Sequence, residues 1–326
     1  MRAVIFDQPG EPEVLRIGNW EVPSLQPREV LVKVHATAIN RADTLQRRGK
    51  YPVPEGASPI LGLEMAGEVV TLGEGVERLN VGDRVCGLLS GGGHAEFVAI
   101  HQDMCIPIPK DMSYESAAAI PEVFLTAFQA LIWLAKLQKN ETVLIHAGAS
   151  GVGTAAIQLA KVLDAPTIIT ASAPKHDLCR NLGADLCVDY RTHDFHLEIK
   201  QQTGKKGVNV ILDFIAGPYF QRNLDSLAVD GRLVMLSLLG GTKPEHINLG
   251  PILRKRLTLM GSTLRSRSPE YKIQLTKEFR EFAWGKFSNG HLKPVIDRVM
   301  DWSEIVEAHK LMEANKNAGK IVLRIS

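Results

Sequence analysis

A glycine-rich turn between an apolar strand and a helix is the clearest sign of chemistry in this sequence. The predicted strand Thr142–His146 runs into the loop Ala147–Gly153, and helix-forming residues follow. Gly148, Ser150 and Gly153 occupy the three glycine places of the dinucleotide fingerprint G-x-G-x-x-G, so the middle place departs from the pattern. Glycines permit a tight turn and let N–H groups at a helix start point at a phosphate. The turn therefore predicts a pyrophosphate site.

The end of the next predicted strand indicates which dinucleotide is bound. An acidic residue about 20 positions after the first glycine would bind the 2′-hydroxyl of NAD. The segment Thr170–His176 contains no acidic residue. Ser172 and Lys175 are suited to a 2′-phosphate instead, because an ammonium group binds phosphate as a point charge. The alternative is that Lys175 is a solvated residue at a helix start. The missing acid and the available base both favour NADPH.

The other reactive residue types form no recognisable catalytic set. The cysteines are scattered singly, without a CxxC pair, and we interpret them as buried or inert thiols of a reducing compartment. They are Cys86, Cys105, Cys179 and Cys187. His193 and His196 lie three residues apart with no third ligand in the pattern, so we interpret them as a solvated pair. His94 and His146 are interpreted as structural.

Strands and helices that alternate after residue 142 must position the glycine-rich turn. Six apolar segments rich in Val, Ile and Leu, the last of them Leu257–Met260, are separated by helical segments. This alternation predicts a doubly wound parallel sheet with strands buried on both faces. The first third of the chain instead has short strands between turn residues, which is typical of a barrel-like domain. The final strand, Lys320–Ile325, is expected to return to that first domain.

Length and composition limit the class of protein. A chain of 326 residues corresponds to about two domains. The net charge of +2 provides no strong field for nucleic acid or an anionic membrane. Polar residues and Pro121 interrupt the longest apolar run, 117–137, so we expect no membrane span. The short apolar N-terminal run is broken by Asp7 and Pro9 and is unlike a signal peptide, so we expect a cytoplasmic protein.

Several motifs together resemble one family. The sequence is similar to the zinc-free quinone oxidoreductase branch of the medium-chain dehydrogenase/reductase superfamily, and within it to the zeta-crystallin-like proteins. The motifs that carry the resemblance extend over nearly the whole chain. They are Asn40–Asp43, Gly49–Tyr51, Ile60–Glu64, Ala118–Glu122, Leu125–Phe128, His146–Gly153, Leu264–Arg267 and Glu313–Asn317.

The resemblance implies a GroES-like β-barrel catalytic domain at 1–120, a Rossmann domain with a six-stranded parallel sheet at 121–264, and a segment at 265–326 that completes the catalytic domain. It implies a quinone held in a cleft between the domains, reduction by NADPH, and a homodimer formed through the edges of the Rossmann sheets. The cofactor residues it implies are Asn40, Tyr51, Thr126, Gly148, Ala149, Ser150, Gly151, Val152, Gly153, Ser172, Lys175, Tyr190, Leu264 and Asn315. Tyr51 and Asn40 are also the candidate catalytic residues, with packing as an equal alternative for Tyr51.

The resemblance also bears on zinc. Asn40 and Leu63 match the places of catalytic zinc ligands in the zinc-dependent relatives, and the closely spaced cysteines of their structural zinc site are missing. Amide and hydrocarbon side chains are poor or impossible zinc ligands. We therefore expect no zinc. Without a Lewis acid, the enzyme should prefer acceptors that take hydride readily, such as quinones and activated carbonyls.

Two other functions remain open at the level of sequence. Reduction of enones or enoyl thioesters uses the same hydride chemistry, and a basic surface would suit a coenzyme A substrate. Arg41, Arg47, Arg48 and Lys50 either supply such a surface or form a solvated helix face or turn. A non-enzymatic NADPH-binding protein of the crystallin type is the third possibility, because a fold does not determine function.

Overall fold

The strand–helix alternation forms a six-stranded parallel sheet in the computed structural model, which describes all 326 residues. The strand order is β10-β9-β8-β11-β12-β13, so the chain reverses direction across the sheet next to β8. The strands are β8 (Val143–Ile145), β9 (Thr167–Thr170), β10 (Leu186–Val188), β11 (Val208–Asp213), β12 (Leu227–Met235) and β13 (Thr258–Gly261). This is the predicted Rossmann sheet, and its switch point is where such folds bind ligands.

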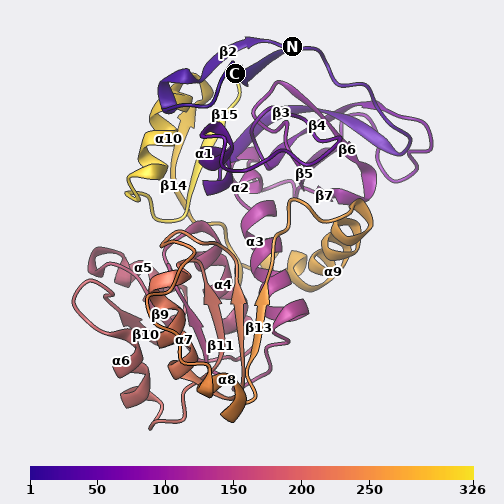
Figure 1. Ribbon diagram of the computed structural model, residues 1–326. Helices are drawn as coiled ribbons and strands as arrows, with labels where there is room; N and C mark the ends of the chain where they lie inside the picture. The colour runs from indigo at the N-terminus through magenta and orange to yellow at the C-terminus, as the bar shows by residue number, and fades with distance from the viewer. The chain divides into compact units, whose positions relative to one another are not determined.

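Five helices connect these strands, and Figure 1 shows α5, α6 and α8 around the sheet. They are α4 (Gly151–Val162), α5 (His176–Leu182), α6 (Phe195–Gln202), α7 (Phe220–Ser226) and α8 (Gly250–Arg254). Helix α4 contacts α5, and α6 contacts α7. The central strands β8 and β11 are buried along nearly their whole length, as expected for strands covered on both faces.

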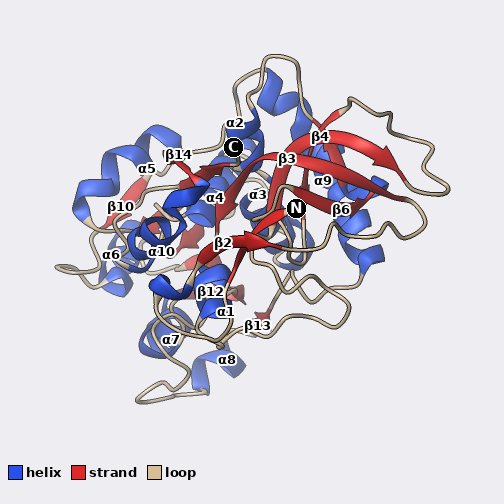
Figure 2. Ribbon diagram, turned by 90° about the horizontal axis from the view of Figure 1, so that it is seen from above, coloured by secondary structure: helices blue, strands red, loops and turns tan.

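The first third of the chain forms the predicted β domain. Its seven-stranded sheet has the order β14-β15-β3-β4-β5-β7, and β6 also pairs with β3. The strands are β3 (Glu29–Ile39), β4 (Glu64–Leu72), β5 (Arg84–Leu88), β6 (Phe97–His101), β7 (Cys105–Pro107), β14 (Ile296–Asp301) and β15 (Lys320–Arg324), with β1 (Arg2–Ile5) and β2 (Arg16–Asn19) as a separate pair. Figure 2 shows β3 and β4 as long neighbouring strands.

The C-terminal segment is part of this β unit. Strand β15 lies antiparallel to β3, with Ile321 opposite Ile39. Contacts divide the chain into unit 1, Met1–Leu125 with Leu264–Ser326, and unit 2, Thr126–Thr263. The helices of unit 1 are α1 (Arg41–Arg47), α2 (Tyr114–Ala118), α9 (Pro269–Ser288) and α10 (Ile305–Glu313). Short 3-10 turns lie at Pro12–Val14, Gln102–Met104, Ala173–Lys175, Gly217–Tyr219 and Trp302–Glu304.

The apolar segment near residue 120 is divided into three short pieces. Helix α2 ends at Ala118, α3 covers Pro121–Phe128, and a π-helical turn covers Gln129–Leu134. Pro121 lacks the N–H that would continue α2, and it fits the first position of a new helix. The stretch Tyr114–Leu134 has the length and apolar composition of a membrane span, but 72% of its 18-residue apolar window is buried inside the protein. Such burial is typical of a helix in the core of a protein.

Candidate functional site

The glycine-rich turn connects β8 directly to the first turn of α4. Ser150 is the N-cap of α4, and its Oγ accepts a hydrogen bond from the N–H of Gly153 at 3.1 Å. Serine is among the best N-cap residues because its side chain satisfies an N–H that lacks a helical partner. Gly151 and Val152 occupy the next two positions, where N–H groups have no acceptor inside the helix. The departure from glycine at Ser150 therefore caps the helix and leaves these two groups to point at an anion.

The glycines on either side of this serine have different packing roles. A Cβ at Gly148 would lie 2.7 Å from the Cβ of Ile169 in β9, so Gly148 permits close packing against the strand. A Cβ at Gly153 would collide with the carbonyl oxygens of Ala147 and Gly148. The fingerprint assigns the helix–strand approach to its third glycine. In this protein that approach belongs to Gly148, and Gly153 instead lets the helix begin against its own loop.

A buried polar network fixes the start of the same loop. His146 is fully buried, its Nδ1 lies 3.0 Å from Thr170 Oγ1, and its Nε2 lies 2.8 Å from Asn223 Oδ1. Asn223 in turn donates to Asp213 at 3.0 Å. Burial lowers the pKa of His146, so the ring stays neutral at physiological pH. These bonds join the carboxyl ends of three strands, and they agree with the structural role predicted for His146.

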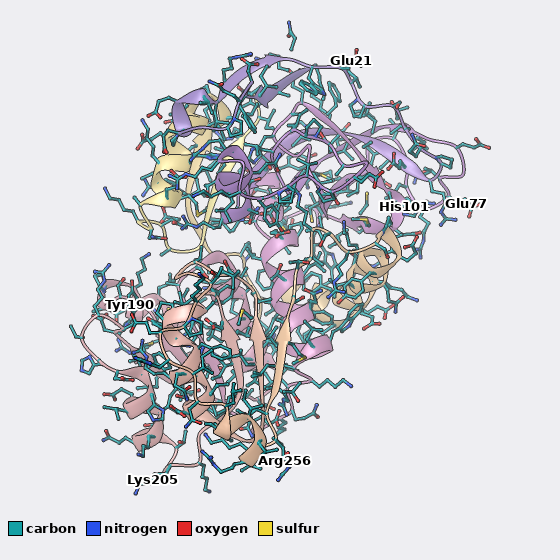
Figure 3. The ribbon with its side chains drawn as sticks, in the orientation of Figure 1. Glu21, Glu77, His101, Tyr190, Lys205 and Arg256 are labelled. Carbon is teal, nitrogen blue, oxygen red and sulfur yellow. The ribbon has the colours of Figure 1, made fainter.

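The ribose candidates lie at the same edge of the sheet. Thr170 and Val188 are register partners at the ends of β9 and β10. Ser172 and Tyr190 each follow two residues later, and Lys175 ends the turn after β9, where its N–H bonds to the Ser172 carbonyl at 2.9 Å. Parallel strands end at a common edge, so these residues share it with the phosphate loop. Figure 3 shows Tyr190 at this edge, with Lys205 and Arg256 at the other end of the unit.

In unit 1, Asn40 belongs to a fully hydrogen-bonded buried cluster. Its Nδ2 donates to Glu64 Oε1 at 2.9 Å, and its Oδ1 accepts from Lys320 Nζ at 2.6 Å. Lys320 also forms a buried ion pair of 2.7 Å with Glu64. Asp43, in the first turn of α1, accepts from the N–H groups of Asn40 and Gly62. The Asn40 amide is therefore engaged within the protein, and its side chain helps to hold β3, β4 and β15 together.

Tyr51 lies under the side chain of Arg265. The guanidinium carbon is 5.3 Å from the centre of the Tyr51 ring, which is a cation–π contact. Tyr51 is partly exposed, and desolvation of the phenol together with the charge of Glu122 raises its pKa. The phenol is therefore neutral at physiological pH and available as a hydrogen-bond donor. This geometry is compatible with the predicted role of Tyr51, which remains a prediction.

The remaining predicted cofactor residues come from different elements. Thr126 lies in α3 and is partly exposed, and Leu264 is buried at the start of the C-terminal segment of unit 1. Asn315 follows α10 in a left-handed conformation, and its Oδ1 accepts from Arg41 at 2.6 Å. Thr126 belongs to unit 2, whereas Leu264 and Asn315 belong to unit 1. Their contacts with a cofactor remain predictions.

The candidate zinc ligands do not assemble into a ligand set. No three His, Cys, Asp or Glu side chains group together as metal ligands. The apolar side chain of Leu63 is buried. His193 and His196 have separate hydrogen-bond partners: His193 Nδ1 lies 2.8 Å from Thr192 Oγ1, and His196 Nδ1 lies 3.0 Å from Ser226 Oγ. His94 is fully buried, consistent with the structural interpretation.

The four cysteines have no disulfide partner, and three of them are buried. Burial raises the pKa of the Cys179 thiol to about 12, and it raises the pKa of Cys187, which is partly exposed. The thiolate is the reactive form of cysteine, so these side chains are poor nucleophiles at neutral pH.

The basic residues near α1 differ in exposure: Arg48 and Lys50 are exposed and Arg41 is partly exposed, but Arg47 is not. Arg47 is completely buried and forms an ion pair of 2.5 Å with Glu313. Arg48 also reaches Glu313, and Arg41 donates to Asn315. The expectation of a solvated or surface position was therefore wrong for Arg47, whereas Arg48 and Lys50 are exposed. The cause is tertiary: α10 packs against α1 and provides a carboxylate for Arg47.

Two groups important to unit 1 were not assigned a role from the sequence. Glu122 and Arg265 both lie in motifs that carry the family resemblance, but the residue types alone indicated no function for them. The Glu64–Lys320 ion pair was also missed, because its partners are far apart in the chain. An isolated lysine at the start of an apolar strand offers no signal that it will be buried.

Comparison with known proteins places this geometry in a family. Residues 26–110 match the alcohol dehydrogenase GroES-like domain, and residues 151–281 match the zinc-binding dehydrogenase model. The chain is 30% identical to quinone oxidoreductase of Lama guanicoe over 99% of its own length and 97% of that protein. The chain belongs to the medium-chain dehydrogenase/reductase superfamily.

Other relatives in this superfamily have different names. The chain is 32% identical to human synaptic vesicle membrane protein VAT-1 homolog, over 92% of its own length and 80% of that protein. It is 31% identical to a phenolphthiocerol/phthiocerol polyketide synthase of Mycobacterium tuberculosis, over 98% of its own length but only 14% of that protein. Family membership alone therefore does not identify the substrate.

The similar solved structures also include enzymes with different substrates. Escherichia coli quinone oxidoreductase complexed with NADPH superimposes with a TM-score of 0.89 at 29% identity, covering 99% of this chain and 100% of that one. CurK enoyl reductase superimposes with a TM-score of 0.88 at 31% identity, covering 100% and 99%. Both the GroES-like and the Rossmann parts of the predicted fold are confirmed.

Proposed function

We propose that this protein is an NADPH-dependent, zinc-independent quinone oxidoreductase. The main support is the carboxyl edge of β8, β9 and β10, where a capped phosphate loop lies beside Ser172, Lys175 and Tyr190. The residues directly after β9, 171–176, include no acid to bind a 2′-hydroxyl, and they contain the cation Lys175 for a 2′-phosphate. Similarity to quinone oxidoreductases, one of them complexed with NADPH, supports the assignment.

In this proposal the residues of the two units have separate tasks. The N–H groups of Gly151 and Val152 bind the pyrophosphate, and Lys175 binds the 2′-phosphate. The cofactor, when bound, supplies hydride to the acceptor. Tyr51 donates a hydrogen bond to the acceptor, and Asn40 holds the end of β3 against β4 and β15 through Glu64 and Lys320.

Turnover measurements test this function. The full chain is incubated with NADPH or NADH and one acceptor from a panel of 1,4-benzoquinone, 1,2-naphthoquinone, 3-buten-2-one and crotonyl-CoA. We expect NADPH oxidation with the quinones at a kcat/KM well above that with the other acceptors, and a preference for NADPH over NADH. Equal use of NADH would contradict the hypothesis that Ser172 and Lys175 bind the 2′-phosphate of NADPH. NADPH binding without turnover of any acceptor would favour a non-enzymatic crystallin-type role.

Enoyl-thioester reduction is the second candidate, because an enoyl reductase is among the similar structures. A coenzyme A substrate would benefit from exposed positive charge, but the burial of Arg47 removes one of the four basic residues available. Efficient turnover of crotonyl-CoA together with poor turnover of quinones would decide for this alternative.

We also propose a homodimer formed through the edge of the Rossmann sheet. Strand β13 is an edge strand, and the segment before it exposes Leu238, Leu239, Leu249 and Leu253. Exposed apolar side chains next to an unpaired edge are typical of an interaction surface. A single monomer mass in light scattering at micromolar concentration would contradict this. The unpaired cysteines agree with a cytoplasmic location, which is part of the same proposal.

A further inference from the structure

Arg265 has charged hydrogen-bond donors for which the protein provides no acceptor. The residue is only 4% exposed, yet its Nη1 and Nη2 atoms have no hydrogen-bond partner. Its Nε donates to the carbonyl oxygen of Ser90 at 2.8 Å, which fixes the direction of the side chain. An unpaired buried donor loses its hydration without compensation, and the cost is larger for a charged group. Arg265 therefore has two donors suited to an oxygen atom that carries negative charge.

Another arginine of unit 1 shows that this arrangement is not required for stacking on a tyrosine. The Arg84 guanidinium lies 4.6 Å from the ring centre of Tyr114, a geometry similar to that of Arg265 over Tyr51. Its Nη atoms, however, donate to main-chain carbonyl oxygens of the segment after β7. These acceptors are Pro109, Lys110 and Met112. Only one of these two stacked arginines is left with unpaired donors.

The carboxyl group of Glu122 belongs to the same cluster. The backbone N–H of Glu122 donates to Glu64 Oε2 at 2.9 Å, which holds the residue beside a buried carboxylate. Burial of its carboxyl, followed by the charge of Glu64, raises the pKa of Glu122 to about 8. Asp43 acts in the same direction, whereas Lys320 and Arg265 oppose the shift. Glu122 is therefore mainly a neutral acid at physiological pH, able to donate a proton.

The charges of Glu122 and Arg265 also act on two neighbouring side chains. Both influence Tyr51 and the ammonium group of Lys272. Lys272 donates to Ser90 Oγ at 2.6 Å, so Lys272 and Arg265 are both anchored on Ser90. The pKa of Lys272 is lowered, mainly by burial. The charges of an anion donor, an acid and a phenol thus interact within unit 1.

We propose that Arg265 binds the oxygen atom of the acceptor that becomes negative during reduction, and that Glu122 delivers a proton to it. The inference rests on the proposed function and extends it. Reduction of a quinone takes up one hydride, which the nicotinamide supplies, and one proton. Hydride addition leaves a hydroquinone oxyanion on the Arg265 donors. An O–H bond then forms as the O–H bond of Glu122 breaks, and the resulting carboxylate regains its proton from water.

Binding of a coloured phenolate tests the Arg265 part without turnover. The probe is 4-nitrophenol, whose phenolate resembles the hydroquinone anion and absorbs visible light, and 4-nitroanisole is its uncharged counterpart. Wild-type protein should bind the phenolate more tightly than the anisole. Arg265→Met should weaken phenolate binding by about 10- to 100-fold, the loss expected for charged hydrogen bonds, and leave anisole binding unchanged. Arg265→Lys keeps the positive charge but loses the paired donors of the guanidinium, so its phenolate affinity should be intermediate.

Arg84→Met is the matched control, since it also removes an arginine stacked on a tyrosine in unit 1. It should lower the melting temperature and leave phenolate binding intact. Equal loss of phenolate and anisole binding in Arg265→Met would show a structural role and overturn the proposal, as would unchanged phenolate binding. Wild-type turnover of 1,4-benzoquinone tests the proposed function separately. Arg265-dependent phenolate binding without such turnover would refute that function and leave the anion site standing.

The pH profile tests the Glu122 part. A proton donor must be protonated, so kcat/KM for 1,4-benzoquinone should fall by about tenfold per pH unit above the pKa of Glu122. In wild type this fall should begin near pH 8. Glu122→Gln should react more slowly below pH 8 and lose this fall. A variant that keeps both the rate and the fall would exclude Glu122 as the proton donor.

Discussion

Replacing Lys320 by methionine should strongly destabilise unit 1. The Lys320 ammonium lies 2.7 Å from Glu64 Oε1, and the two side chains are only 3% and 0% exposed. It also donates to the Ile39 carbonyl at 3.0 Å and to Asn40 Oδ1 at 2.6 Å. Lys320→Met would leave the Glu64 carboxylate buried without a countercharge. Removing one partner of such a pair costs about 3–5 kcal/mol.

Methionine is a suitable replacement because it retains the length and most of the apolar stem of lysine. For a folding unit of this size, the expected loss corresponds to a fall in melting temperature of about 6–20 °C. Differential scanning calorimetry measures the fall, and urea unfolding at constant m-value measures the free energy.

A second substitution separates the charge from the packing. Glu64→Gln removes the negative charge but retains an oxygen that can accept from Asn40 Nδ2 or the Glu122 N–H. In the Lys320→Met background it should restore stability, with a coupling energy of about 1–3 kcal/mol. The refuting result is a Lys320→Met variant that loses less than about 1 kcal/mol, or that gains nothing from Glu64→Gln. Either outcome would mean that the ion pair is not what holds β15 against β3 and β4.

The cofactor loop, the ribose site and the zinc question provide the remaining predictions. Lys175→Ala should weaken NADPH binding by about 1–3 kcal/mol in titrations and leave NADH binding nearly unchanged, and equal losses would argue against contact with the 2′-phosphate. Gly151→Val should abolish NADPH binding in a folded protein, whereas Gly153→Val should also lower the melting temperature, through overpacking of about 1–3 kcal/mol against the loop carbonyls. NADPH binding by Gly151→Val at the parent affinity would remove the loop from the proposed site. Elemental analysis should find no stoichiometric zinc and chelators should leave activity intact, a result that one zinc per chain, lost together with activity, would contradict.

Local sequence was sufficient to locate the Rossmann elements. The predicted strand Thr142–His146 and the observed β8, Val143–Ile145, differ by one residue at each end. Short apolar runs between helical periods are recognisable because strands covered on both faces must be continuously apolar. The phosphate loop was recognisable for a related reason, since its backbone geometry is local and restricts the residue types.

For other residues the surroundings could not be predicted without knowing which residue packs against them. Local spacing suggested that Arg47 is exposed, but α10 buries it beside Glu313. The fingerprint assigns the close approach of helix and strand to Gly153, but in the structure Gly148 makes it. In both cases the pattern defines the local element, and the packing of the folded chain decides what the side chain meets.

The sequence by itself determined the six Rossmann strands, the fold class, the position of the phosphate loop and the absence of an acid at 171–176. Each of these features depends on residues within about 20 positions of one another, so short-range sequence patterns are enough to predict it. Only the tertiary structure brought Lys320 to Glu64 and Arg265 to Tyr51. It also showed that Glu122 lies beside a buried carboxylate, which raises the pKa of its own carboxyl to about 8. Burial and charge pairing depend on which distant segments exclude water from a group, and neither composition nor spacing contains that information.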